Sequence, residues 1–301
     1  MSKTLRVHLF LFLANLIYGV SFTIAKDVVP NYVGPFGAIV CRVSVAMVLF
    51  FLLIPFRKQE KIQLKDYWLF ALCGVFGIAA NQLFFFKGLS LTTPISASLV
   101  MVTTPILTLV LSVLFKDEKM SLMKGIGVLL GAAGAASIIL IKDNTASASN
   151  QMLGDLFIFL NATCYAIYLV MVKPLMRKYN PLTVITWIFF CGWFLVVPVG
   201  YNQFHNINWN DMPIHILLEL GFIVIATTFF AYLLNILALR DAQPSVVGIY
   251  IYAQPLLATI FALMLGKDEF KLVYALAAVF IFSGVFLVSK NNFIKTKPVA
   301  E

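Results

Sequence analysis

Charge is scarce in this chain. Aspartate, glutamate, lysine and arginine make up 12% of the 301 residues, against about 25% in an ordinary soluble domain. Apolar residues make up 61%. So few charges cannot cover the surface of a soluble protein, and so much apolar surface excludes a disordered chain. The composition therefore predicts an all-α integral membrane protein whose main partner is the lipid bilayer.

Cysteine is also scarce, with four residues that lie far apart inside apolar runs and form no CxxC pair: Cys41, Cys73, Cys164 and Cys191. This pattern excludes a disulfide scaffold and argues against a zinc site. The three histidines show no ligand spacing either. We therefore predict no metal and no cofactor.

Several catalytic motifs are missing from the sequence. There is no GxxxxGK[ST] loop, so direct ATP drive is not expected. There is no HExxH motif, no pair of intramembrane aspartates and no Ser/His pair at depth. An intramembrane enzyme is therefore not expected, and the chain is predicted not to be an enzyme.

Lysine and arginine exceed the acidic residues and give a net charge of +9. In a soluble protein this excess would suggest nucleic acid as a partner, but in a membrane protein it marks cytoplasmic loops. If the N-terminus is cytoplasmic, sixteen of these residues lie on the cytoplasmic side and five on the other, with Arg42 alone inside a span. We predict cytoplasmic termini and no nucleic-acid binding.

Ten apolar runs are each long enough to cross a bilayer, for which about 20 residues are needed. The first run is longer than the apolar core of a cleavable signal peptide, so we expect it to remain as the first helix. The links between the runs leave no room for a soluble domain. The ten runs are 5–25, 35–56, 67–87, 93–115, 122–141, 153–173, 181–202, 214–238, 245–265 and 270–289.

The two halves of the chain resemble each other. Pro94 and Pro105 match Pro244 and Pro255 at the same spacing, and an Asp-Glu pair follows in both halves. Each half holds five runs, so the second half enters the membrane in the opposite sense. We predict two inverted five-helix repeats, at residues 1–145 and 146–301, the second with a short cytoplasmic tail. Inverted repeats are typical of secondary transporters, and a two-half unit disfavours a channel.

The segments YGVSFTIAK and TTPISASLVMVTTP, with the closing Asp-Glu pair, resemble EamA-type transporters of the drug/metabolite transporter superfamily. The resemblance covers residues 5–290. It implies an inner-membrane carrier with a central cavity lined by spans 1, 3, 4, 6, 8 and 9. It also implies export of small metabolites, such as amino acids or amphiphilic compounds, by alternating access. Import of a nucleoside, sugar or amino acid is the alternative, and a monomer is expected.

Arg42 is the most unusual residue, because a charge inside a span costs about 2.5–3.5 kcal/mol on insertion scales. It is expected to bind a substrate carboxylate or phosphate, or to bridge neighbouring helices structurally. Lys87 ends the third run and is expected either to line the cavity or to reach the membrane interface. In the second half, Ile188 takes the place of Arg42 and Leu237 that of Lys87, so the charged features are one-sided.

Amides and phenols recur at helical spacing inside several runs. Such groups can orient a polar substrate without a buried charge, although hydrogen bonds between helices would use the same residues. We predict that they line the cavity: Asn15, Tyr18, Asn81, Gln82, Asn161, Tyr165, Tyr168, Tyr232, Asn235, Tyr252 and Gln254.

Two prolines and two acids complete the predicted set. Pro105 and Pro255 lie inside spans four and nine, where each removes a backbone hydrogen bond and is predicted to form a hinge or a static kink. Asp155 and Glu219 lie near the start of spans six and eight. Either could bind a coupling proton, and charge compensation at a helix N-terminus is the alternative.

Overall fold

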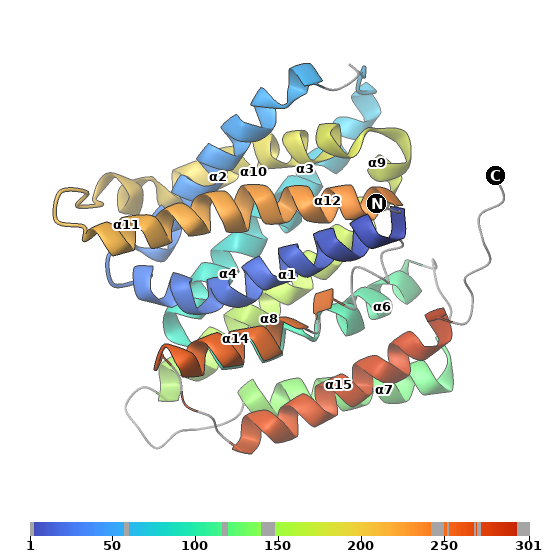
Figure 1. Ribbon diagram of the computed structural model, residues 1–301. Helices are drawn as coiled ribbons and strands as arrows, with labels where there is room; N and C mark the ends of the chain where they lie inside the picture. The colour runs from blue at the N-terminus through green and yellow to red at the C-terminus, as the bar shows by residue number, and fades with distance from the viewer. Residues whose placement is uncertain are drawn as a thin grey trace.

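The computed structural model describes residues 3–56, 60–115, 120–139, 148–241, 250–251, 253–267, 269 and 272–293. Every regular element within these residues is helical (Figure 1). The first half contains α1 (Lys3–Val28), α2 (Pro35–Leu52), η1 (Ile54–Phe56), η2 (Leu64–Asp66), α3 (Tyr67–Gly74), η3 (Val75–Ala79), α4 (Ala80–Leu91), α5 (Pro94–Met101), α6 (Thr104–Leu114) and α7 (Leu122–Ile139). The second half contains α8 (Ala148–Met171), α9 (Lys173–Lys178), α10 (Pro181–His205), α11 (Ile214–Gly221), η4 (Phe222–Phe230), α12 (Ala231–Asp241), α14 (Ala253–Met264) and α15 (Leu272–Phe293).

Within the described residues, seven helical segments are long and apolar enough to cross a membrane, and three further apolar helices are shorter. The all-α membrane fold is thus confirmed at this level, and the arrangement in ten spans and two repeats stays a prediction. Many large side chains on the outside of the bundle are apolar, including Leu129 and Leu218, which are 72% and 68% exposed. Lipid is the solvent that accepts such a surface.

Some predicted boundaries were wrong. The second run was expected to continue to residue 56, but α2 ends at Leu52 and a short 3-10 helix follows. The sixth run was expected to begin at 153, but α8 begins at Ala148. The bounds of the fourth run agree with the span Pro94–Leu114, and its helix is interrupted next to Pro105, where α5 ends at Met101 and α6 begins at Thr104.

Glycine permits the close helix contacts of this bundle. The α7–α15 pair forms the layer drawn at the lower edge of Figure 1, and a Cβ atom at Gly284 would lie 2.5 Å from the Gly127 carbonyl oxygen. The second close pair is α2 with α10. There, a Cβ atom at Gly200 would lie 2.5 Å from the Phe36 carbonyl oxygen. Backbones that approach this closely leave no room for a side chain.

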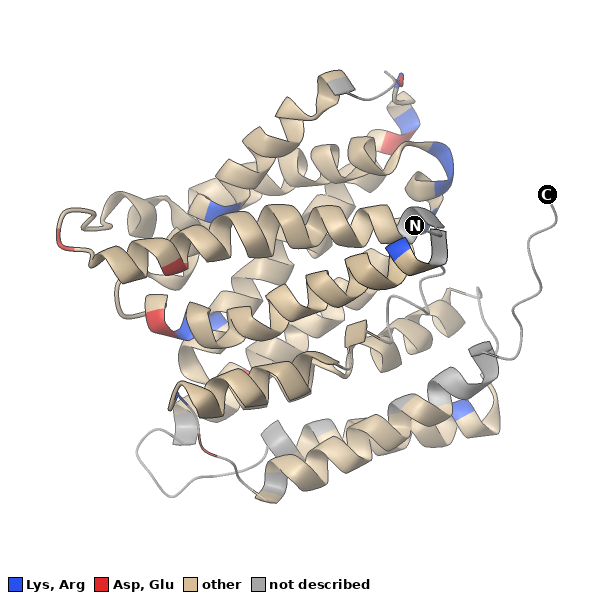
Figure 2. Cartoon of the chain, in the orientation of Figure 1, with Lys and Arg blue, Asp and Glu red and all other residues tan. Residues whose placement is uncertain are grey.

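Lysine and arginine gather at the end of the bundle where α1 begins, and fewer lie at the opposite end (Figure 2). Helices α3 and α9 also lie toward that end in the same orientation (Figure 1). That this basic end faces the cytoplasm stays a prediction from the distribution of lysine and arginine.

Candidate functional site

A cavity of about 100 Å³ lies inside the bundle. Its walls come from α1, α2, α4, α5, α8, η4, α12 and α14, so both halves of the chain contribute. Its lining contains ten of the thirteen residues that the sequence predicted for a cavity: Asn15, Tyr18, Arg42, Asn81, Gln82, Asn161, Tyr165, Tyr232, Asn235 and Gln254.

Of the other three predicted residues, two are described and lie outside the lining of this cavity. Lys87 is half-buried near the end of α4 and lies outside the lining. Tyr168 is buried, with its ring centroid 5.8 Å from that of Tyr165, and it fills the space beside Gly77. Tyr252 lies outside the described residues.

Arg42 is 4% exposed and reaches the cavity from the middle of α2. Its Nε donates a 2.6 Å hydrogen bond to the Thr228 hydroxyl, which in turn donates to the Ile223 carbonyl at 3.0 Å. Its guanidinium carbon lies 4.6 Å from the centre of the Phe86 ring, within range of a cation–π interaction. A hydroxyl on η4 and an aromatic face on α4 therefore hold the cation in place.

Further polar pairs connect helices around the cavity. Gln82 and Tyr232 each lie four residues from a contact of Arg42, Phe86 and Thr228 respectively, and the Gln82 amide donates to the Tyr232 hydroxyl at 3.5 Å. The Asn235 amide donates at the same distance to the Tyr18 hydroxyl. These are long, weak bonds that a polar ligand could replace. The described lining of the cavity thus combines amides and phenols with the guanidinium of Arg42.

Two amide pairs are held more tightly. Asn81 and Asn161 each donate to the other's backbone carbonyl, at 3.3 and 2.7 Å, and so connect α4 to α8. The Gln254 amide donates to Asn15 Oδ1 at 2.7 Å, and Asn15 donates to the Leu11 carbonyl at 2.8 Å. These bonds fix the amide orientations and so determine which atoms face the cavity.

Three acceptors that belong to cavity-lining residues are buried without a hydrogen-bond partner in the described structure: Gln82 Oε1, Asn161 Oδ1 and Thr227 Oγ1. A buried polar atom without a partner costs about 1–3 kcal/mol. Water or a bound molecule that donates hydrogen bonds would satisfy all three. The cavity therefore suits a polar ligand better than a purely apolar one.

Sequence reasoning missed Thr227, Thr228 and Phe86, which contribute to the cavity or hold Arg42. The two threonines lie in η4, a π-helical stretch, and a second π-helical stretch, η3, directly precedes α4, in which Asn81 is the second residue. π-Helical turns rotate the following residues relative to an α-helix and are frequent at functional sites. A Thr-Thr pair in an apolar run is a weak signal, and no sequence pattern in these segments indicates the change of helical pitch.

The predicted hinge at Pro105 falls at the break between α5 and α6. Proline has no N–H to donate to the carbonyl of Met101, and the Thr104 hydroxyl donates to that carbonyl instead, at 2.7 Å. Pro255 lies near the start of α14, and most of the preceding segment lies outside the described residues. The break is a structural fact, and hinge motion stays a prediction.

The two predicted proton sites lie away from the cavity. Asp155 is fully buried two turns inside α8, rather than at the helix start that the sequence suggested. Its Oδ1 accepts hydrogen bonds from the hydroxyls of Thr92 and Ser96, the latter at 2.7 Å, while Oδ2 is buried without a partner in the described residues. Glu219 is half-buried in α11, and its Oε2 is likewise unpartnered.

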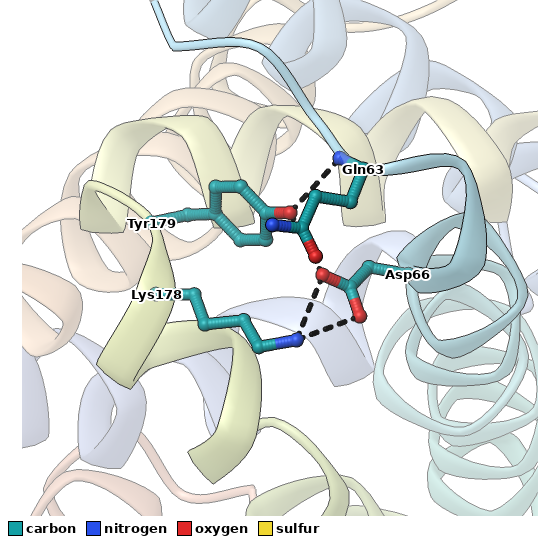
Figure 3. A network of polar contacts seen from close by, with 4 residues as sticks. All are labelled: Gln63, Asp66, Lys178 and Tyr179. Carbon is teal, nitrogen blue, oxygen red and sulfur yellow. Dashed lines mark hydrogen bonds and ion pairs between the residues drawn. The ribbon is translucent and has the colours of Figure 1, made fainter.

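Polar contacts join the two halves of the chain at both ends of the bundle. At the basic end, Lys178 on α9 donates to both carboxylate oxygens of Asp66 at 3.0 Å. Tyr179 donates to Asp66 Oδ2 at 2.8 Å and accepts a 3.0 Å bond from the Gln63 backbone N–H (Figure 3).

The opposite end is joined by other residues. Lys267 forms a 2.7 Å ion pair with Asp27, and this hydrogen bond raises the pKa of Lys267. Gln203 Oε1 accepts from the backbone N–H groups of Phe36 and Gly37, at 2.8 and 3.2 Å. Each end of the bundle thus carries a polar connection between the two halves.

Comparison with known proteins agrees with this architecture. The model of the EamA-like transporter family matches twice, over residues 5–140 and 152–290. The uncharacterized transporter YyaM of Bacillus subtilis is 24% identical, over 95% of this chain and 94% of its own length. An uncharacterized transporter of Archaeoglobus fulgidus is 26% identical over 97% of this chain and 99% of its own.

The chain is also similar to a plant protein and to a solved structure. The protein WALLS ARE THIN 1 of Arabidopsis thaliana is 26% identical over 79% of this chain and 71% of its own length. A crystal structure with 19% identity superposes with a TM-score of 0.64 and covers 98% of this chain and all of that chain. At this identity the structural match supports the fold alone.

Proposed function

Because the chain belongs to the EamA-like transporter family and is a multi-pass membrane transporter, we propose that it is a secondary carrier. In this proposal it moves small metabolites, such as amino acids or amphiphilic compounds, out of the cell by alternating access. In this proposal ten spans form two inverted five-helix repeats, both termini are cytoplasmic and the protein acts as a monomer in the inner membrane.

One observation carries this proposal. A single cavity collects amides, phenols and a guanidinium from both halves of the chain, and both halves match the same family model. Inverted-repeat carriers hold their substrate between the halves and expose it to either side in turn. Polar connections at both ends, through Asp66–Lys178 and Asp27–Lys267, are suitable gates for such a cycle.

Filling the cavity is expected to stop transport without unfolding the protein. Met101 lines the cavity and is half-buried, so Met101→Trp places an indole ring in the substrate's space. Metabolites in medium and cytoplasm are compared between cells that express wild type, the variant and an empty control. Wild type is expected to change metabolite levels relative to the empty control. We expect Met101→Trp to reduce this change at least about tenfold, because the loss of substrate binding costs more than about 1.4 kcal/mol.

The matched control is Met264→Trp, because Met264 is 76% exposed on the outside of the bundle. This variant is expected to transport like wild type at equal membrane abundance. Compounds that rise in the medium would support export, and compounds that accumulate inside would turn the direction to uptake. Equal transport by wild type and Met101→Trp would contradict a role for this cavity.

Proton coupling through Asp155 stays a prediction with a direct test. If Asp155 carries the coupled proton, Asp155→Asn is expected to abolish accumulation driven by a pH gradient while substrate exchange across vesicles continues. The measurement is uptake into vesicles with and without an imposed gradient. Wild-type and Asp155→Asn vesicles that respond equally to the gradient would exclude this residue as the proton site.

A further inference from the structure

Arg42 is the only charged side chain in the described lining of the cavity, which otherwise consists of amides, hydroxyls, phenols and apolar groups. We propose that the transported substrate carries one carboxylate, and that Arg42 binds it. This inference rests on the proposed function, since it assigns the chemical class of the molecule that the cavity accepts.

Most N–H donors of the Arg42 guanidinium have no hydrogen-bond partner among the described residues. An arginine side chain carries five N–H donors in a planar fork, and the structure gives Arg42 one hydrogen bond, from Nε to Thr228. The contact with Phe86 lies on the face of the ring and uses no donor. The terminal nitrogens are therefore left for a partner, and their planar geometry matches the two oxygens of a carboxylate.

The described part of the chain supplies no counter-ion for this charge. The ion pairs Lys178–Asp66 and Lys267–Asp27 lie at the two ends of the bundle and do not involve Arg42, and no carboxylate lies among the described residues of the cavity lining. Buried charges in membrane proteins are normally paired, or face a pathway for ions or substrates. The missing partner of Arg42 is therefore expected to come from the substrate.

The charge balance favours a monocarboxylate. One guanidinium neutralises one negative charge, whereas a phosphate monoester carries about −1.5 to −2 at neutral pH. Lys87, which could have supplied a second positive charge, lies outside the lining. A phosphate group would thus bring more negative charge than the guanidinium can balance, while the guanidinium balances a single carboxylate.

The rest of the cavity suits a substrate with hydrogen-bond donors away from its carboxylate. Gln82 lies one turn from Phe86 on α4, and its Oε1 is a buried acceptor without a partner, as is Thr227 Oγ1 beside Thr228. These atoms can accept from a hydroxyl, amide or ammonium group of the bound molecule. The rings of Tyr18 and Tyr232, whose centroids are 6.4 Å apart, provide aromatic surface.

The test uses purified full-length protein in lipid nanodiscs and measures binding, separately from transport. The probes are matched pairs of an acid and its neutral amide: 3-phenylpropanoate with 3-phenylpropanamide, butanoate with butanamide, and N-acetylphenylalanine with its amide. Phenyl phosphate tests whether the cavity binds a phosphate group instead of a carboxylate. The proteins are wild type, Arg42→Gln, Arg42→Lys and the control Arg177→Gln, which removes an exposed arginine on α9.

We expect at least one acid to bind to wild type and to Arg177→Gln at least about tenfold more tightly than its amide does. This ratio is the gain in affinity that a hydrogen bond between charged groups gives. Arg42→Gln is expected to reduce the ratio to near one, and Arg42→Lys to retain part of it. A thermal melt of each variant confirms that it is folded.

Four results would overturn the assignment. The first is equal binding of acids and amides by wild type, and the second is an acid preference that survives in Arg42→Gln. The third is no binding of any acid at millimolar concentration, and the fourth is tighter binding of phenyl phosphate than of the acids. Carboxylate binding without movement of that compound across vesicles would instead contradict the proposed transport function and leave the role of Arg42 standing.

Discussion

A covalent link between positions 66 and 178 is expected to stop transport almost completely. The Asp66–Lys178 ion pair joins the start of α3 to the end of α9, at the end of the bundle that we propose to be cytoplasmic. Alternating access requires that each end of the cavity open in turn. The variant Asp66→Cys/Lys178→Cys, joined by a short thiol cross-linker that reductant can cleave, would hold this end closed.

Transport by the cross-linked protein is expected to fall at least about tenfold, which corresponds to a barrier increase of only 1.4 kcal/mol. Reductant should restore the rate. The single variants Asp66→Cys and Lys178→Cys, treated with the same reagent, control for loss of the ion pair itself. They should retain most activity, because Lys178 is 44% exposed, although Asp66 is 9% exposed, and an ion pair that solvent reaches contributes about 0–1 kcal/mol. Wild-type transport by fully cross-linked protein would show that this end does not open.

The second large effect is expected from Gly192→Leu, and it concerns folding. A Cβ atom at Gly192 on α10 would lie 2.6 Å from Ile78 Cβ and 2.7 Å from Ile78 Cγ2. On the facing side, a Cβ atom at Gly74 would lie 2.7 Å from Cys191 Cβ. Neither backbone can move aside without opening the contact that positions η3, the π-helical stretch just before Asn81.

Overpacking typically costs about 1–3 kcal/mol, and we expect Gly192→Leu to reach or exceed the upper value because its neighbours include backbone atoms. The measurement is the yield of monodisperse protein in detergent together with its melting temperature. Gly221→Leu is the matched control, because a Cβ atom at Gly221 has no neighbour within 4 Å. Equal melting of the two variants and wild type would show that the α10–η3 contact is looser than these distances indicate.

Much of the cavity could be predicted from sequence because polar residues are conspicuous in apolar runs. Asn15 and Tyr18 share a face of α1 by their spacing, and both line the cavity. Arg42 is conspicuous for its charge. Family membership was likewise recognisable from short segments around Pro94 and Pro105, and the family match over both halves confirms it.

Other features could not be predicted because they depend on tertiary structure or helical pitch. The Asp66–Lys178 contact joins residues 112 positions apart. The π-helical turns of η4 bring Thr228 to Arg42, and no residue type in that apolar run requires them. The burial of Asp155 follows from the start of α8 at Ala148, several residues before the apolar run begins.

The central claim is that one cavity is exposed alternately to the two sides of the membrane. The most direct measurement places a single cysteine in it, Met101→Cys, in a chain whose four native cysteines are replaced. A membrane-impermeant thiol reagent is then applied to either side of oriented vesicles. We predict labelling from both sides, with labelling from the proposed cytoplasmic side lost when positions 66 and 178 are cross-linked in a background that carries those cysteines. Labelling from one side only, or equal labelling from both sides despite the cross-link, would contradict alternating access.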